Sequence, residues 1–294
     1  MEIDRRSLMK GMLAGGALLA MGAPPWSLAG QPARRPSHCV LLLGGTSADG
    51  LFEIGARTAC AEMTYENLQT LKLKGGLLAG TDRIVQLLEQ SRGARWIAVM
   101  GDASSVIFLE LARTAGVRLL SMGTHACSSD GACHLRHDLA STSADHSAGG
   151  LLASHFIQRT DSFSIAESFL QEPAEKEGQA LISWGAPGFS SYRFTEPDAI
   201  HVHCSGCSFS DIRRLLGLEI TDGWVPIPPH VCANESATRR SENWVESVGY
   251  SMTASALGID SVRESCMSRA FVHQSSNETR TQPMERFVSF VMDI

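Results

Sequence analysis

The chain has 294 residues, of which 44% are hydrophobic and 19% charged, and its formal net charge is −6. This composition is typical of a globular protein with a buried core, and it excludes a disordered chain. The acidic balance offers no basic surface, so we expect no nucleic-acid partner.

Residues 1–29 predict an export signal. Arg5 and Arg6 precede an apolar run, GMLAGGALLAMGAP, that is too short to span a bilayer comfortably. The pattern resembles a twin-arginine signal peptide, although that family usually has Ser or Thr where Asp4 stands and Phe where Leu8 stands. The resemblance implies a bacterial, periplasmic protein that the twin-arginine machinery exports. An uncleaved anchor is the alternative, which Pro24 and Pro25 disfavour because they interrupt the apolar run. After cleavage no stable membrane span is expected.

Eight cysteines in an exported chain favour disulfides, because the periplasm is oxidising. The twin-arginine route weakens this expectation, since it exports chains that have already folded in the reducing cytoplasm, often with a cofactor. Disulfide pairing and metal ligation therefore both remain open.

The elements expected up to residue 157 alternate between strands and helices. Apolar runs predict strands, and apolar residues at helical spacing predict helices. The expected elements are a strand over 39–43, a helix over 52–71, a helix from 81 to 92, a strand over 96–100, a helix over 102–115 and a strand over 117–122. This order is typical of a parallel, doubly wound sheet, and it predicts a Rossmann-like lobe over residues 30–157. Neither a phosphate loop nor a G-x-G-x-x-G motif is present.

Two loops of this lobe are candidates for binding a ligand, because ligands bind at the carboxyl ends of parallel strands. They follow the strands over 96–100 and 117–122 and are rich in Gly, Ser and Thr. The predicted ligand-binding residues are Asp102, Ser104, Ser105, Thr124 and His125, together with Arg136 and Asp145 further along the chain. Catalysis by Ser104 or Ser105 is disfavoured, because no G-x-S-x-G motif is present.

Residues 80–158 resemble the first lobe of type I periplasmic binding proteins of the amino-acid-binding type. The motifs are a strand ending in Gly101, a Ser-Ser turn, the phrase TAGV, a strand ending in hydroxyl residues, Arg136, and the phrase DHSAG at 145–149. The resemblance implies binding of a small polar solute. The remaining residues are too few for the second lobe that this family closes over its ligand.

Residues 158–294 predict a smaller α+β part that contains Cys and His. The segment TDSFSIAESFLQEPAEKEGQ is expected to form an amphipathic helix and a polar loop, and ALISWGA a strand. Further helices are expected over 210–216 and 243–257. The segments RAFVHQ and ERFVSFVMDI are expected to pair as a terminal hairpin or as neighbouring strands.

A metal site is the first hypothesis for the segment AIHVHCSGC and the downstream PHVC. Imidazole and thiolate groups are ligands of zinc and of other transition metals. The candidate ligands are His201, His203, Cys204, Cys207, His230 and Cys232. The alternative is a disulfide that joins Cys204 to Cys207 or to Cys232. A metal- or redox-active exported enzyme is accordingly the alternative to a solute-binding protein.

A second cluster has the form H-x-C-x5-C-H-x2-H and includes His125, His134 and His137. Its spacing does not match the C-x-x-C-H motif of c-type haem attachment. A small disulfide loop between Cys127 and Cys133 is favoured, because Gly131 allows the turn that such a loop needs.

Overall fold

The structure is a computed structural model. It describes residues 36–73, 77, 81–129, 131–140, 146–159, 162–170, 186–194, 200–217, 223–228, 241, 243–258, 266–275 and 285–294.

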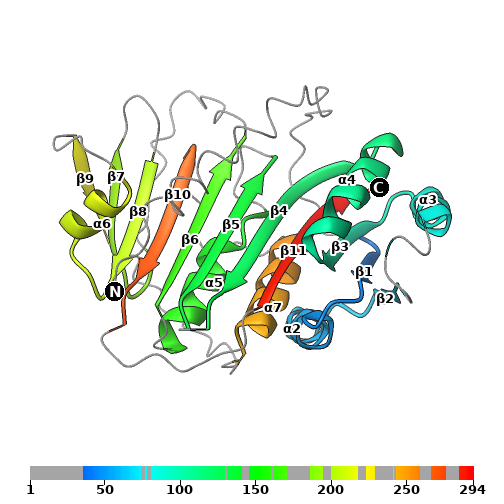
Figure 1. Cartoon of the computed structure of the whole chain (residues 1–294), viewed down its shortest axis with the longest axis horizontal. Coiled ribbons are helices and arrows are strands. Elements are labelled where there is room, and N and C mark those ends of the chain that lie inside the picture. Colours follow the sequence, from blue (N-terminus) through cyan, green and yellow to red (C-terminus); the bar gives the residue numbers. More distant parts are fainter. Residues whose placement is uncertain are drawn as a thin grey trace.

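The described chain combines eleven strands with helices in one mixed α/β structure (Figure 1). The strands are β1 (Cys39–Leu43), β2 (Leu68–Lys72), β3 (Arg95–Met100), β4 (Arg118–Cys127), β5 (Cys133–Leu139), β6 (Phe163–Phe169), β7 (Ser190–Phe194), β8 (Ile200–Ser205), β9 (Trp224–Ile227), β10 (Ser268–His273) and β11 (Glu285–Asp293). The helices are α2 (Asp49–Glu62), α3 (Thr81–Gln90), α4 (Asp102–Thr114), α5 (Gly149–Phe156), α6 (Phe209–Leu215) and α7 (Trp244–Ala256), with a 3-10 turn at Ile157–Arg159.

All described strands belong to one sheet, in the order β2-β1-β3-β11-β4-β5-β6-β10-β8-β7-β9. Most pairings are antiparallel. The parallel pairs are β1 with β2, β1 with β3, β5 with β6, and β8 with β10. The parallel sheet expected in the first part of the chain is therefore restricted to β2-β1-β3, next to which β11 runs antiparallel.

Strand β11 lies between β3 and β4 and pairs with both. Because it is antiparallel to each of them, β3 and β4 run in the same direction, as the strand-helix-strand order around α4 predicts. The two strands are not neighbours, however, since a segment from the far end of the sequence separates them.

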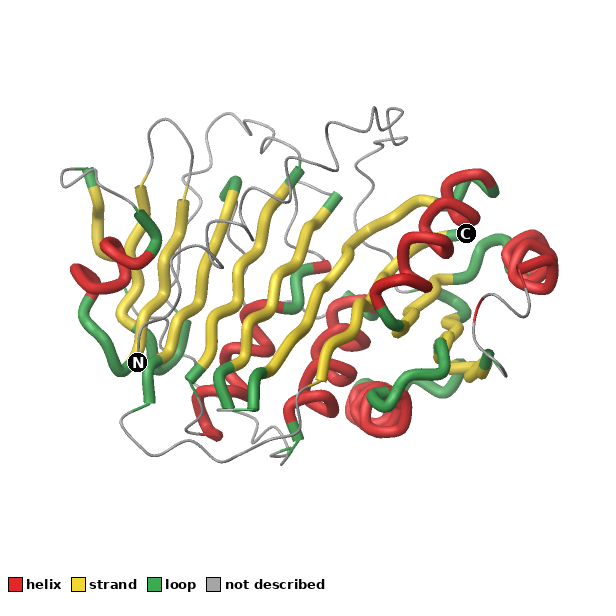
Figure 2. Tube along the Cα trace, viewed as in Figure 1, coloured by secondary structure: helices red, strands yellow, loops and turns green. Residues whose placement is uncertain are grey.

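The helices cover the sheet on both sides (Figures 1 and 2). On one side, named the α7 face, α2, α5 and α7 bury Phe52, Leu152 and Val248 against the sheet. On the other side, named the α4 face, α3 and α4 cover one end of the sheet and α6 covers the opposite end. Strands β1 and β3 are buried on both sides, which explains their continuous apolar sequences.

Several local predictions are confirmed. Strand β1, helices α3, α4 and α6, and helix α7 lie where the sequence patterns place them, within a few residues. Helix α7 begins after Asn243, whose side chain accepts a hydrogen bond from the Val245 amide at 2.8 Å, and it ends before Gly258, which has a φ of 89°.

The helix expected over 52–71 is wrong in its second half. Helix α2 ends at Glu62, and residues 68–72 form the edge strand β2. Thr64 adopts a left-handed conformation with a φ of 51°, which interrupts any helix at this point. The polar residues of β2 reflect its position at the edge of the sheet, where one side of the strand is exposed.

The expectations for the second part of the chain are wrong at two places. The amphipathic helix is strand β6, in which Phe163, Ile165 and Phe169 alternate with partly exposed residues. The terminal hairpin does not form, because β10 pairs with β6 and β8 whereas β11 pairs with β3 and β4. The strand expected at ALISWGA lies outside the described residues, apart from Ala186.

No helix among the described residues has the length and apolar character that a membrane crossing requires.

Candidate functional site

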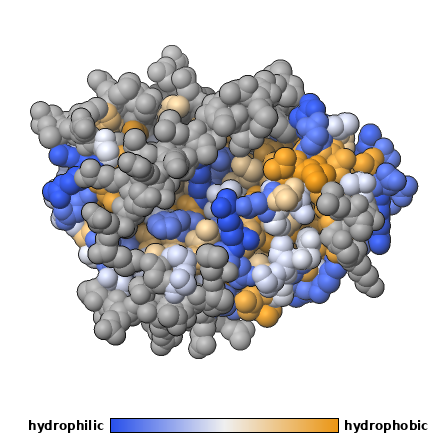
Figure 3. Space-filling view, viewed as in Figure 1, coloured by the Kyte–Doolittle hydropathy of each residue, from blue (hydrophilic) through white to orange (hydrophobic). Residues whose placement is uncertain are grey.

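The middle of the α4 face carries small and polar side chains. Here β5 and β6 alternate between buried residues, which point to the α7 face, and partly exposed residues, which point to the α4 face. No described helix covers this region, which lies between α4 and α6 (Figure 1). Figure 3, viewed from this side, shows hydrophilic side chains in the middle of the face and hydrophobic ones over α4. The residues of the central strands that point to this face are partly exposed, or exposed in the case of His134: Thr124, Ala126, His134, Arg136, Asp138, Ser164, Ala166 and Ser168.

Arg136 and Asp138 form the charged centre of this region. Nε and Nη2 of Arg136 donate to Oδ1 of Asp138 at 3.4 and 3.1 Å. The two side chains are only 18% and 13% exposed. An ion pair at this depth is less screened than a surface pair, so a third charged group placed beside it would interact strongly.

Three of the predicted ligand-binding residues share the α4 face. Thr124 lies directly opposite Arg136 in the pairing of β4 with β5. Asp102, at the first turn of α4, forms an ion pair with Arg286, whose Nε is 2.7 Å from Oδ2 of Asp102. Arg286 is two residues from Val288, which pairs with Thr124. The start of α4 and the middle of β4 therefore lie near one another, although the loop expected at Thr124 is part of the strand.

The other predicted ligand-binding residues lie elsewhere. The Ser105 hydroxyl is buried and donates to the Asp102 carbonyl at 2.6 Å, so it is used within the first turn of α4. Ser104 lies beside it in the same turn and is partly exposed. His125 is 1% exposed and points to the α7 face, because it follows Thr124 on a strand. Asp145 lies outside the described residues.

A row of polar residues crosses the α7 face at one level of the sheet. Its members lie directly opposite one another on consecutive strands, from β11 to β7. They are Ser289, Gly123, His137, Glu167, Arg269, His201 and Arg193. Apart from Arg193, the side chains of this row are buried. The next level of the sheet is largely apolar, with His125 and His203 within it.

Glu167 and Arg269 form a fully buried ion pair at the centre of this row. Nε of Arg269 donates to Oε2 of Glu167 at 2.7 Å, and neither side chain is exposed. The Ser147 hydroxyl and the backbone amide of Gly149, the first residue of α5, also donate to the carboxylate, at 2.8 and 2.9 Å. Burial by itself would raise the pKa of Glu167, but the Arg269 charge, the neighbouring His137 and the Ser147 hydroxyl lower the pKa to about 2. The carboxylate thus anchors the start of α5.

His125 and His137 lie edge to face, with ring centroids 5.2 Å apart. Nε2 of His125 is 2.8 Å from the Ser289 hydroxyl. Gly123 makes room for the rings, since a Cβ there would lie 2.5 Å from Nε2 of His125. Burial lowers the pKa of His125 well below its usual range, and the neighbouring His137 lowers it further. His125 is therefore neutral in the folded protein.

The sheet divides the described members of the predicted metal site. His203 points to the α7 face, where its ring stacks on Phe271 and Nδ1 is 2.8 Å from the Ser191 hydroxyl. Cys204, the next residue, points to the α4 face and packs under α6 with Cys207. His201 shares the face of His203, because it lies two residues away. In the part of the chain that the structure describes, no three His, Cys, Asp or Glu side chains form a group that could hold a metal. His230 and Cys232 lie outside it.

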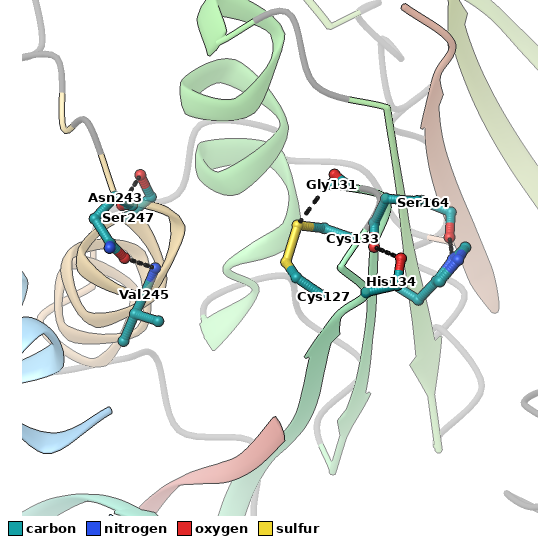
Figure 4. Close-up of a disulfide and its surroundings, with 10 residues drawn as sticks. Cys127, Gly131, Cys133, His134, Ser164, Asn243, Val245 and Ser247 are labelled. Carbon is teal, nitrogen blue, oxygen red and sulfur yellow. Dashed lines mark hydrogen bonds between the residues drawn. A yellow bond between two sulfur atoms is a disulfide. The ribbon is translucent and has the colours of Figure 1, made fainter. Parts of the chain in front are cut away.

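The predicted Cys127–Cys133 disulfide is present and joins the ends of β4 and β5 (Figure 4). The two cysteines are direct partners in the pairing of these strands, with Cα atoms 4.1 Å apart. Beside them, His134 contacts the Ser164 hydroxyl of β6 at 2.8 Å (Figure 4). The disulfide therefore fixes the hairpin that carries Thr124 and Arg136.

The buried polar row contains residues that the sequence patterns did not single out. Glu167 and Arg269 belong to segments that were interpreted as a helix and as part of a hairpin. Once β6 is recognised as a strand, a charged residue at 167 stands among the apolar positions 163, 165 and 169, and this is the signal for a buried ionic partner. Asp138 could be found in the same way, because it lies two residues after Arg136 on a strand and therefore points to the same face.

In comparisons with known proteins, no family model, no curated protein and no solved structure matches the chain.

Proposed function

We propose that the protein binds a small polar solute on the α4 face, above Thr124, Arg136 and Asp138. The observation that supports this most directly is the largely buried Arg136–Asp138 pair on a part of the sheet that no described helix covers. Serine and alanine side chains on β6 surround the pair, so the floor of the site is shallow and polar. Small-molecule sites commonly combine such a surface with a few polar groups that converge.

The chemistry of Arg136 favours a solute that carries an anionic or strongly accepting oxygen. A guanidinium group has five N–H donors in one plane. Asp138 accepts from two of its nitrogens through one oxygen. Among the described residues, the remaining N–H donors of Arg136 and the second carboxylate oxygen of Asp138 have no partner. A solute can therefore donate to this oxygen and accept from these N–H groups. A solute with one acceptor group and one donor group would satisfy both partners of the pair.

We further propose that the chain reaches the periplasm by the twin-arginine route, where it acts as a solute-binding protein. The export proposal rests on Arg5 and Arg6 and the short apolar run after them. The Rossmann-like succession β1, α2, β3, α4 and β4 supports the binding proposal, because α4 begins at the carboxyl end of β3 and faces the same side as Arg136.

The test is a solute screen on the purified chain without its first 29 residues. Carboxylates, amino acids and other small anions are added one at a time, and the melting temperature identifies those that bind, since a ligand of the folded state raises it. Titration calorimetry then compares the wild type with Arg136→Gln and with Arg113→Gln. Arg113 pairs with Glu110 on the exposed surface of α4 and serves as the matched control.

We expect Arg136→Gln to weaken binding at least tenfold and Arg113→Gln to leave it unchanged. A solute that binds the wild type and Arg136→Gln with equal affinity would place its site elsewhere and overturn the proposal. The same holds if no solute of these classes raises the melting temperature.

A further inference from the structure

Cys204 and Cys207 form a C-x-x-C sequence at the end of β8, outside the proposed solute site. Cys204 is the fifth residue of the strand, and Cys207 directly precedes Ser208, the residue that caps α6. Between them Gly206 has a φ of 69°, and a Cβ there would lie 2.0 Å from the Gln274 carbonyl oxygen. The turn that brings Cys207 back towards the strand therefore requires glycine.

Both thiols lie in one apolar cluster beneath α6. Cys204 is 2% exposed and packs with Val202, Ile212 and Leu216, while Cys207 is partly exposed and packs against the same cluster. Cys204 Sγ is 3.4 Å from the Ser190 carbonyl oxygen, and Cys207 Sγ is 3.4 Å from that of Ser205. Neither cysteine is in a disulfide. A backbone carbonyl oxygen is a weak hydrogen-bond partner for a thiol.

We propose that Cys204 and Cys207 are a reversible redox pair, which closes to a disulfide when the protein meets a low-molecular-weight disulfide such as oxidised glutathione. A Cys207 thiolate attacks one sulfur of the small disulfide and releases one small thiolate, which takes up a proton. The Cys204 thiolate then attacks the sulfur of Cys207 in the mixed disulfide and releases the second small thiolate. The protein loses two electrons and two protons, and the small disulfide becomes two thiols.

The order of the two steps follows from exposure. Cys207 is partly exposed and accessible to a small disulfide, whereas Cys204 is buried and therefore reacts second, with the sulfur of Cys207 in the mixed disulfide. Burial raises the pKa of both thiols, that of Cys204 to about 11, with a further contribution from the charge of Cys207. Since the thiolate is the reactive form, the reaction is slow at neutral pH and accelerates as the pH rises.

Closure would tie the start of α6 to β8. Ser208 caps α6 by accepting from the Asp211 amide at 3.2 Å, and it follows Cys207 directly in the chain. A disulfide between Cys204 and Cys207 therefore adds a side-chain cross-link between the helix start and the strand. In the reduced protein, the packing of the apolar cluster holds the helix start against the strand.

The experiment incubates the full chain, purified with its Cys127–Cys133 disulfide intact, in glutathione buffers of increasing oxidised fraction at pH 8. Remaining thiols are alkylated with iodoacetamide under denaturing conditions and counted by mass spectrometry, and peptide mapping identifies the new bond. The wild type is compared with Cys207→Ser and with Cys60→Ser. Cys60 is a buried thiol in a different apolar cluster and is the matched control.

We expect the wild type and Cys60→Ser to lose two alkylation sites as the oxidised fraction rises, with Cys204 linked to Cys207, and to regain both in excess reduced glutathione. Cys207→Ser should lose none, and the rate for the wild type should increase between pH 7 and pH 9. The proposal is overturned if both cysteines stay alkylated in fully oxidised glutathione, if either pairs with a third cysteine, or if Cys207→Ser loses two sites like the wild type.

Discussion

Gly55 of α2 lies directly against the backbone of Glu246 on α7, so that a Cβ at position 55 would be 2.0 Å from the Glu246 carbonyl oxygen. The contact is reciprocal, since a Cβ at Gly249 of α7 would be 2.3 Å from the Phe52 carbonyl oxygen. No side chain separates the two helices at these points. This close approach lets both helices lie on the same part of the sheet, over β3 and β11.

Replacing Gly55 with alanine should therefore destabilise the protein. The obstructing atoms belong to the backbone of α7 and cannot rotate away, so we expect a loss of about 2 kcal/mol or more in the free energy of unfolding. Gly50→Ala is the control in the same helix, because a Cβ there meets nothing within 4 Å. It should be neutral or stabilising by up to about 1 kcal/mol. Urea unfolding measures both, and equal stabilities of the two variants would contradict the helix contact.

Replacing Arg269 with methionine should cost more than replacing both members of the buried pair. In Arg269→Met the Glu167 carboxylate stays buried without its cation, for which we expect a loss of about 3–5 kcal/mol in the free energy of unfolding. The double variant Glu167→Gln, Arg269→Met removes both charges and should recover a large part of that loss. Thermal or urea unfolding tests the comparison, and a double variant less stable than Arg269→Met would show that the two charges do not depend on each other.

The protein should lose stability on acidification in two ranges of pH. The pKa of His125 is lowered in the fold, so below about pH 6.5 the unfolded chain takes up a proton that the folded protein does not. The pKa of Glu167 is about 2 in the fold against a usual 4.5, so its contribution is complete above pH 4.5 and is lost as the pH falls from 4.5 to 2.

Urea unfolding between pH 8 and pH 2 measures this dependence over both ranges. Substituting His125 with glutamine should reduce the slope of stability against pH between about 6.5 and 5, since the amide does not titrate. Stability that is constant from pH 8 to pH 5 in the wild type would mean that the buried histidines take up protons without unfolding.

Replacing Arg5 and Arg6 with lysine should keep the protein in the cytoplasm of a bacterial host. Lysine preserves the charge but lacks the planar guanidinium group, so a receptor that recognises the arginine pair should not accept it. The control is the same exchange at Arg34 and Arg35, a second arginine pair that lies after the expected cleavage point. Cell fractionation with immunoblotting measures the outcome, and an unchanged periplasmic yield would remove the export proposal.

Local signals in the sequence were sufficient for the elements that local interactions define. The capping side chain of Asn243 and the glycine at 258 mark both ends of α7, and the run CVLLL marks a buried strand. The same reasoning identified the Cys127–Cys133 disulfide, because the two cysteines are only six residues apart and enclose a turn.

Pairings between distant segments could not be predicted in this way. Nothing in the sequence ERFVSFVMDI shows that it inserts between β3 and β4, because an apolar strand can pair with any partner of suitable pattern. For the site, Thr124 was expected in a loop and Arg136 from the motif of the resemblance, but both lie on strands. The separation of Thr124 from His125 follows from the alternation of a strand that extends further than expected. Glu167 and Arg269 meet only because β6 and β10 are neighbours.

The position of β11 also constrains how a growing chain can fold. During synthesis β3 and β4 leave the ribosome well before residues 285–293, and until these arrive each strand keeps an edge with unsatisfied amides and carbonyls. The two flanks of the sheet, β2-β1-β3 and the strands from β4 onward, have no hydrogen-bonded connection with each other before that moment. A nascent chain is thus open to strand exchange with its neighbours on a polysome until β11 closes the gap, and chaperones that bind extended apolar segments would act in this interval.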